Sequence, residues 1–309
     1  AVNARLDKVE ALHRNRKLRQ EIIERLETLP DIERALARVT AGRGGPRDLA
    51  NLRDGFIAAE QIHGLLETAQ EGALAEMREG LKADDDLRAF TGTLCEALAG
   101  DLPFLARDGG FIREGYAPAL DELKTARDDS RKLIAGLQGT YQNRTGIESL
   151  KISYNNMLGY FIEVPAKKAD ALMIRKGEND NPFVHRQTLA SSVRFTTPDL
   201  NELESKIASA AERAKAIEID IFDGLVVQAQ VLSKDISRIA KALAASDVFS
   251  GLAELAEDKN HVRPRMTHDN AFEIIEGRHP VVEDALESEH TQFTPNDCNL
   301  SANNRLWLL

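Results

Sequence analysis

Side chains that could contact a polyanion are concentrated between residues 141 and 198. This segment has eight Lys and Arg against five Asp and Glu, a net charge of +3. The whole chain carries −10, so the difference of −13 belongs to the remaining residues. A net-positive segment on an acidic protein is a candidate polyanion contact. The alternative is that +3 over 58 residues is ordinary variation.

The side-chain types in this segment favour a phosphate backbone over base edges, because nothing in it has the pattern of a recognition helix. Amide, hydroxyl, imidazole and cationic donors all bind phosphate oxygens. Each neutralised phosphate releases counterions, so such binding should weaken as salt rises. For any single candidate, the alternative is a solvated surface residue. The candidate contacts are Asn155, Asn156, Lys167, Lys168, Arg175, Lys176, His185, Arg186, Gln187 and Ser191.

Other chemistries have weaker support in the sequence. Cys95 and Cys298 belong to no CxxC motif, and the four histidines between residues 261 and 290 lack metal-ligand spacing. The acidic run 84–86 predicts a solvated helix start, and the alternative of a metal site has no partner ligands in view. The Asp-Gly-Gly of residues 107–112 indicates a tight turn rather than a phosphate-binding loop, because no Lys-Ser/Thr follows it.

The first part of the chain is predicted to be helical. Apolar residues recur at helical spacing over residues 1–100, with breaks at Pro30 and in the loop 42–46. Asp31 is suited to cap the helix that follows Pro30. The same spacing predicts a helix over residues 120–137, directly before the basic segment.

Within the basic segment the apolar period drops to two, which predicts strands near Ile152 and over 160–164 with a turn at 155–156. Thr197 followed by Pro198 is a helix start. The apolar repeat then continues past a stutter near Gly224, which predicts roughly 45 residues of helix, about 65 Å long. A small β-module is therefore expected between two long helices.

The last part of the chain changes to a strand pattern, at residues 272–275, 277–282 and 306–309. Aromatic residues make up only 5% of the chain, which favours packing of helix on helix over a β-sandwich or β-barrel. The sequence has neither a signal peptide nor the roughly 20 apolar residues of a membrane span. We therefore expect a cytoplasmic protein. Both ends look cut, so we expect this chain to be a piece of a larger protein.

Three segments resemble the MutS family of DNA mismatch-repair ATPases: LGYFIEV at 158–164, HRQTLASSVRFTTPDLNELESKI at 185–207, and EGRHPVVE at 276–283. RDGGFIREGY at 107–116 and RPRM at 263–266 agree with it. The match follows the family's order over essentially the whole chain.

This resemblance implies a mainly α fold with long lever helices and a helical core. A small β-rich clamp domain is inserted between two helices, and the chain ends with the β-rich start of an α/β ATPase domain. The implied divisions are core and ascending lever at 1–138, clamp at 139–197, descending lever at 198–262, and truncated ATPase domain at 263–309.

The resemblance also implies that the clamp grips the backbone of double-stranded DNA without reading sequence. In the family, the levers couple this grip to the nucleotide state of a homodimer. The implied partners are other mismatch-repair proteins, and no membrane is involved. ATP and Mg²⁺ belong to the parent ATPase, whose phosphate-binding loop would follow Leu309. The chain itself is therefore expected to hold no cofactor and to be no enzyme. Of the nucleotide site, only Phe293 matches a family position, the one that stacks on adenine.

The sequence departs from the family in the clamp. The family often has Arg where His185 stands, and Lys-Asn where Ala190 and Ser191 stand, so the DNA contacts are expected to be weaker or shifted to Lys167 and Lys168. One alternative function is a coiled-coil scaffold with no nucleic-acid role. Another is an ATPase.

Overall fold

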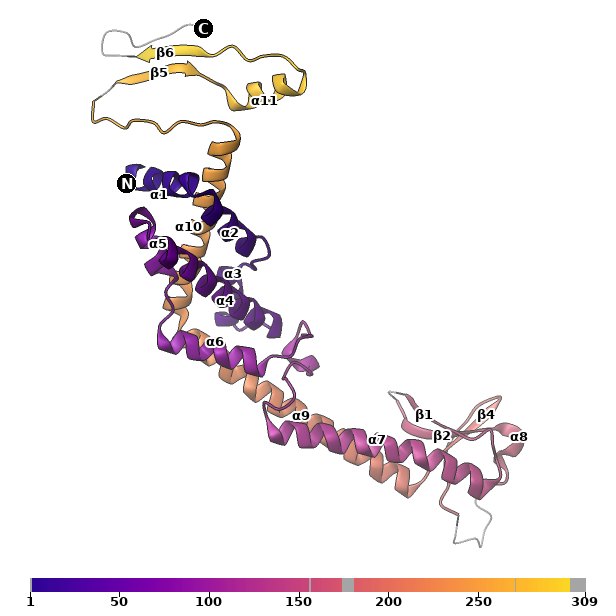
Figure 1. Cartoon of the computed structure of the whole chain (residues 1–309). Coiled ribbons are helices and arrows are strands. Elements are labelled where there is room, and N and C mark those ends of the chain that lie inside the picture. Colours follow the sequence, from indigo (N-terminus) through magenta and orange to yellow (C-terminus); the bar gives the residue numbers. More distant parts are fainter. Residues whose placement is uncertain (1, 156, 174–180, 270, 301–309) are drawn as a thin grey trace.

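The computed structural model describes residues 2–155, 157–173, 181–269 and 271–300. The molecule is elongated (Figure 1): a helical body continues into a pair of long helices, which carry a small β-sheet at their far end. A second, two-stranded sheet lies at the opposite end of the body. The predicted fold class, mainly helical with a β-module between two helices and a β-rich C-terminal segment, is confirmed.

The body begins with short helices whose starts are fixed by side-chain caps. Asp31 accepts a hydrogen bond from the Arg34 amide at 2.9 Å, and Asp84 accepts one from the Leu87 amide at 2.8 Å. The predicted cap at Asp31 and the helix-start interpretation of 84–86 are therefore confirmed. The elements are α1 (Val2–Arg14), α2 (Arg16–Leu26), α3 (Ile32–Thr40), α4 (Pro46–Ala69), η1 (Gly72–Leu74), α5 (Ala75–Leu81) and α6 (Asp85–Ala97).

A later helix, α10 (Ser233–Asp258), completes the core of the body. Its Ile236, Ile239 and Leu243 are buried in the same apolar cluster as α1 to α6. Because burial of apolar surface is the main favourable term in folding, the body's stability depends on residues more than 100 positions apart in the chain.

The long helix pair consists of α7 (Pro118–Thr145) and α9 (Pro198–Val231), which we call the lever pair. Thr197 caps α9, as predicted: its hydroxyl accepts the Leu200 amide at 3.1 Å. The same hydroxyl lies 2.9 Å from the phenol oxygen of Tyr141 on α7. Both side chains are buried, and burial raises the pKa of the Tyr141 phenol above its ordinary value. This hydrogen bond joins the two helices where the sheet begins.

The predicted single descending helix is divided in the structure. α9 runs through the expected stutter at Gly224 without a break, and this helix of 34 residues ends instead at Val231. Leu232, with φ −85° and ψ 8°, leaves the α-helical region, and α10 begins at Ser233. Gly224 faces solvent, so it lowers helix propensity without creating a bend.

A four-stranded antiparallel sheet occupies the tip of the lever pair, with strand order β1-β2-β4-β3. Ile162, Val164 and Phe195 are buried on the face that packs against Ile134 and Tyr141 of α7. The predicted strands near Ile152 and over 160–164 are confirmed. The elements are β1 (Lys151–Asn155), β2 (Gly159–Pro165), α8 (Ala166–Ala169), β3 (Val184–Thr188) and β4 (Ser192–Thr196). We call this sheet with α8 the clamp module.

The C-terminal segment differs in part from the prediction. β5 (Phe272–Gly277) forms as expected and pairs with β6 (Asn296–Leu300), which the sequence analysis missed. The strand predicted over 277–282 is wrong from Pro280 onward, because α11 (Pro280–Ser288) begins there. Proline is well suited to the first turn of a helix, and Glu283 favours the positive helix start. The strand predicted at 306–309 lies outside the described residues.

Replacing Thr197 by Val, which keeps the shape but removes the hydroxyl, is expected to lower the free energy of unfolding by about 1–3 kcal/mol. The substitution removes the α9 cap and leaves the Tyr141 phenol without its partner. Urea denaturation followed by circular dichroism measures the change. Thr197→Ser keeps the hydroxyl and is the control. Equal stability of the two variants would contradict the prediction.

Candidate nucleic-acid interface

Two of the candidate lysines lie at one end of the clamp sheet. Lys167 and Lys168 are exposed on α8, directly after β2. The backbone amide of Ala166 donates to the carbonyl oxygen of Ser191 at 3.0 Å, which places α8 beside the β3–β4 turn. Ser191 is exposed there. The structure therefore brings Lys167, Lys168 and Ser191 together.

The edge strand β3 carries the next group of candidates, and all five of its residues are exposed. A register shift between His185 and Gln187 leaves Arg186 outside the regular pairing with β4. Bulges of this kind redirect a side chain. Within the described part of the chain, Arg186 makes no ion pair or side-chain hydrogen bond. Its charge is therefore available to an external anion.

His185 is exposed but already has partners in the clamp module. Its ring meets Phe195 edge-on, with centroids 6.0 Å apart and an interplanar angle of 82°. Its Nε2 lies 2.9 Å from the hydroxyl oxygen of Thr188. A contact between His185 and a phosphate would compete with the Thr188 bond, so His185 is a weaker candidate than Arg186.

Asn155 lies at the opposite end of the sheet. Its side-chain oxygen accepts the amides of Met157 at 3.0 Å and Leu158 at 2.7 Å, which closes the β1–β2 turn. The seven residues of β2 separate this turn from α8, about 20 Å at the usual rise per residue. The candidate set therefore does not form one cluster. Asn156, Arg175 and Lys176 lie outside the described residues.

Arg194, which was not a sequence candidate, has a structural role on the outer face of the sheet. Its Nε donates to Glu163 at 3.0 Å and its Nη1 donates to Gln187 at 3.0 Å. Its guanidinium carbon also lies 4.4 Å from the centroid of the Phe161 ring. Glu163 and Gln187 both face Arg194 in the strand register. Gln187 is thus partly committed to the sheet.

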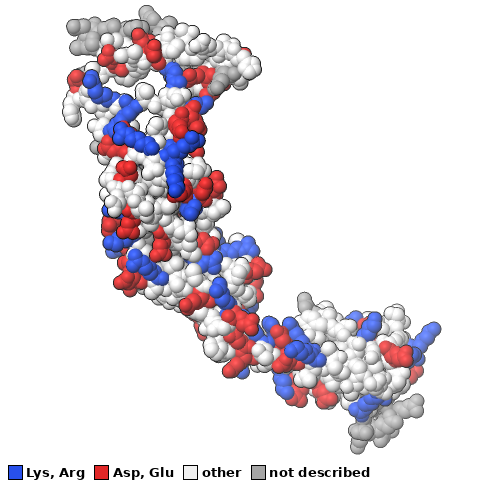
Figure 2. All heavy atoms as spheres, in the orientation of Figure 1, with Lys and Arg blue, Asp and Glu red and all other residues white. Residues whose placement is uncertain are grey.

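Lys151 was also missed as a candidate. It is exposed at the start of β1, opposite Glu163 in the register. The strand alternation of β1 and β2 places Lys151 and Glu163 on one face, and this pattern could have identified it. Over residues 141–198 the structure describes six Lys and Arg against three Asp and Glu. On the face that Figure 2 shows, the Lys and Arg side chains at this end of the molecule are scattered rather than gathered in a single stripe.

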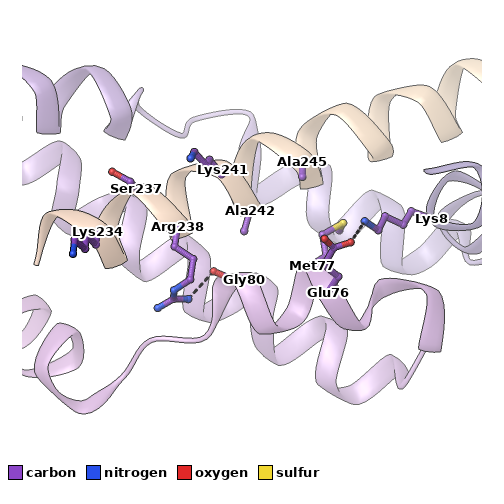
Figure 3. Close-up of a pocket in the computed structure, with 10 residues that line it drawn as sticks. All are labelled: Lys8, Glu76, Met77, Gly80, Lys234, Ser237, Arg238, Lys241, Ala242 and Ala245. Atoms are coloured by element: carbon purple, nitrogen blue, oxygen red, sulfur yellow. Dashed lines mark hydrogen bonds and ion pairs between the residues drawn. The ribbon is translucent and has the colours of Figure 1, made fainter. Parts of the chain in front are cut away.

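A second basic group lies in a groove of the body between α1, α5 and α10 (Figure 3). Of its four cations, Lys8 forms an ion pair with Glu76. Arg238 donates to the carbonyl oxygens of Gly80 and Lys82, each at 2.9 Å. The other two are Lys234 and Lys241. Because half of its cations already have internal partners, this groove is a weaker phosphate site than α8 and β3.

Phe293 is half-buried beside an open groove next to α11. Two cations near it are already engaged: Arg278 donates to the Lys259 carbonyl oxygen at 2.6 Å, and Lys259 pairs with Asp284 at 2.6 Å. The partly open ring fits an adenine face. The residues described here supply no glycine-rich loop for the phosphates, so they fit only the base end of a nucleotide.

Comparison with known proteins shows which family this arrangement represents. The family model described as MutS domain III matches residues 1–253. The chain belongs to the MutS family. The DNA mismatch repair protein MutS of Rhodopseudomonas palustris (strain HaA2) is 46% identical over 318 residues, covering 100% of this chain and 34% of that protein. The DNA mismatch repair protein MutS of Nitrobacter winogradskyi is 46% identical over 306 residues, covering 97% of this chain and 34% of that protein.

The chain therefore spans about a third of the length of these MutS relatives. The domain III match covers the body, the lever pair and the clamp module. Among the described residues, none of the helices is both long enough and apolar enough to cross a membrane.

Replacing Arg194 by Met is expected to lower the free energy of unfolding by about 1 kcal/mol. The substitution removes the contacts with Glu163 and Gln187 together with the cation–π contact. Thermal or urea denaturation measures the loss. Lys151→Met removes a charge from the same face without an ion pair among the described residues, and is the control. A loss no greater than that of the control would show that the Arg194 contacts add no stability.

Proposed function

We propose that this chain is the DNA-backbone clamp and lever segment of a MutS protein. The observation that carries the proposal is the position of unpaired cations at the far end of the lever pair. Lys167, Lys168 and Arg186 are exposed, and none has an ion partner among the described residues. They lie on a small net-positive module, whereas the rest of the chain is acidic.

The form of the clamp module favours contact with phosphates over reading of bases. Its exposed donors lie on a four-residue helix, a tight turn and an edge strand. Base readout in the major groove requires a helix or a two-stranded ribbon that enters the groove with side chains directed at base edges. Scattered cations and hydroxyls instead contact the backbone of any duplex. The clamp is therefore proposed to bind double-stranded DNA without sequence preference.

The levers provide a physical connection between this grip and the nucleotide region. α9 runs from the clamp module along α7, and α10 continues through the body to the segment that holds Phe293. We propose that clamp 139–197, core and ascending lever 1–138, descending lever 198–262 and ATPase start 263–309 act as one coupled unit. In the whole protein, ATP and Mg²⁺ would bind beyond Phe293. A homodimer, other repair proteins and a cytoplasmic, DNA-associated location belong to the same proposal.

Arg186→Ala is expected to weaken binding to all duplexes alike and to reduce the slope of log K against log salt by about 1. Fluorescence anisotropy with two unrelated 20-base-pair duplexes, over a range of salt concentrations, measures both quantities. Arg34→Ala removes an exposed cation from α3 in the body and is the charge-matched control. It should leave the slope unchanged.

Two outcomes would contradict the clamp. A changed preference between the duplexes would mean that Arg186 reads bases. An absence of binding at low salt would favour the alternative of a coiled-coil scaffold with no nucleic-acid role.

The chain by itself is expected to release no phosphate from ATP when Mg²⁺ is supplied. Phe293 offers a surface for the base, but the described residues offer no cradle for the phosphates. A coupled phosphate-release assay, with and without duplex DNA, measures turnover. Turnover that survives repeated purification would contradict the proposal and favour the ATPase alternative.

A further inference from the structure

The loop at residues 107–116 holds none of the proposed DNA contacts, and it lies at the base of the lever pair (Figure 1). It is part of the connection 98–117 between α6 and α7, and it overlaps the end of η2 (Ala106–Asp108). Backbone hydrogen bonds attach it to the end of α6. The Ala99 amide donates to the carbonyl oxygen of Phe111 at 2.8 Å, and the Arg113 amide donates to the carbonyl oxygen of Ala97 at 2.8 Å. The loop is therefore a fixed part of the body.

A buried carboxylate of α9 reaches this loop. Glu218 is only 3% exposed. Its Oε2 accepts the Gly110 amide at 2.6 Å, and its Oε1 lies 3.3 Å from Nζ of Lys124 on α7. Lys124 Nζ also donates to the Ile112 carbonyl oxygen at 3.3 Å. One charge pair thus joins both lever helices to the loop. A carboxylate buried this deeply is costly unless it is paired.

The shape of the loop is matched to this carboxylate. Gly109 has φ +71°, and a Cβ there would lie 2.8 Å from Glu218 Oε2. Only glycine adopts this backbone without strain while leaving room for the carboxylate. One turn further along α9, the Phe222 ring meets the buried Phe111 of the loop edge-on at 6.0 Å. The charged contacts and the ring packing therefore fix the same junction, which is the place where α7 and α9 meet the loop 107–116.

We propose that Glu218 and Lys124 are positioning residues that hold the lever pair at a set angle to the body. They thereby determine where the clamp module points. These contacts give the junction a direction that apolar contacts alone lack, because the Gly110 amide fixes Oε2 while the Lys124 ammonium lies beside Oε1, which makes no hydrogen bond among the described residues. The consequence for DNA rests on the proposed clamp function. The effect on lever orientation does not.

Distances between spin labels on the clamp module and the body test the orientation directly. The spin labels are attached at Ser153 on β1 and at Gln61 on α4, both of which are exposed residues. The full chain carries Cys95→Ser and Cys298→Ser, so that no other thiol is labelled. With Glu218→Gln, which keeps the side-chain volume, the distance distribution from pulsed electron paramagnetic resonance should broaden or shift. Glu202→Gln breaks an exposed pair with Lys206 on the same helix and should leave it unchanged.

Binding of a 20-base-pair duplex separates positioning from direct contact. If Glu218→Gln reduces the binding-competent orientation to about a third, the apparent Kd rises about threefold. The salt slope should stay at its wild-type value, because the same phosphates are contacted. Arg186→Ala, in contrast, is expected to change the slope.

A distance distribution for Glu218→Gln identical to that of Glu202→Gln would overturn the proposal. If Glu218→Gln does not fold, Lys124→Met takes its place with the same labels, and an unchanged distribution there overturns the proposal equally. The distance measurement contains no DNA, so it can succeed even if the clamp fails to bind duplex. Failure of the proposed function and failure of this inference are therefore distinguishable.

Discussion

The packing of α7 against α9 is the constraint on which the clamp depends. Four strands of five to seven residues form only a small sheet, and one face of it must be covered to be stable. The lever helices cover that face through Ile134, Tyr141 and Leu200, and the hydrogen bond between Tyr141 and Thr197 joins them at its edge. The clamp module therefore shares its core with the lever helices, and the proposed coupling between lever and clamp relies on this shared core.

Internal pairing determines which cations are available to a ligand. Arg194 stabilises the outer face of the sheet, and Arg238 binds carbonyl oxygens at the end of α5. A cation that binds an internal partner must lose that partner to bind a phosphate. Lys167, Lys168 and Arg186 bear no such cost among the described residues, because they are exposed and have no ion partner there. The proposed interface follows from this division between engaged and free charges.

Local signals predicted most of the fold, whereas long-range contacts were not predictable from one sequence. Caps at Asp31 and Thr197, and the alternation in β2, depend on neighbouring residues. The role of Arg194 depends on Glu163, which lies 31 positions away in the chain and faces it only once the strands pair. The buried pair of Glu218 and Lys124 likewise requires the levers to be folded together. The helix break at Leu232 and the helix beginning at Pro280 were both misplaced by weak local patterns.

The central proposal is that the clamp module, at the end of the molecule far from the acidic body, binds DNA through its unpaired cations. Hydrogen exchange with and without a 20-base-pair duplex tests this most directly. On binding, the account predicts slower amide exchange in α8 and over residues 184–192. It predicts no change in amide exchange over residues 233–245, the part of α10 that lines the basic groove of the body. Protection confined to α10, with none in α8 or β3, would place the DNA on the body and contradict the account.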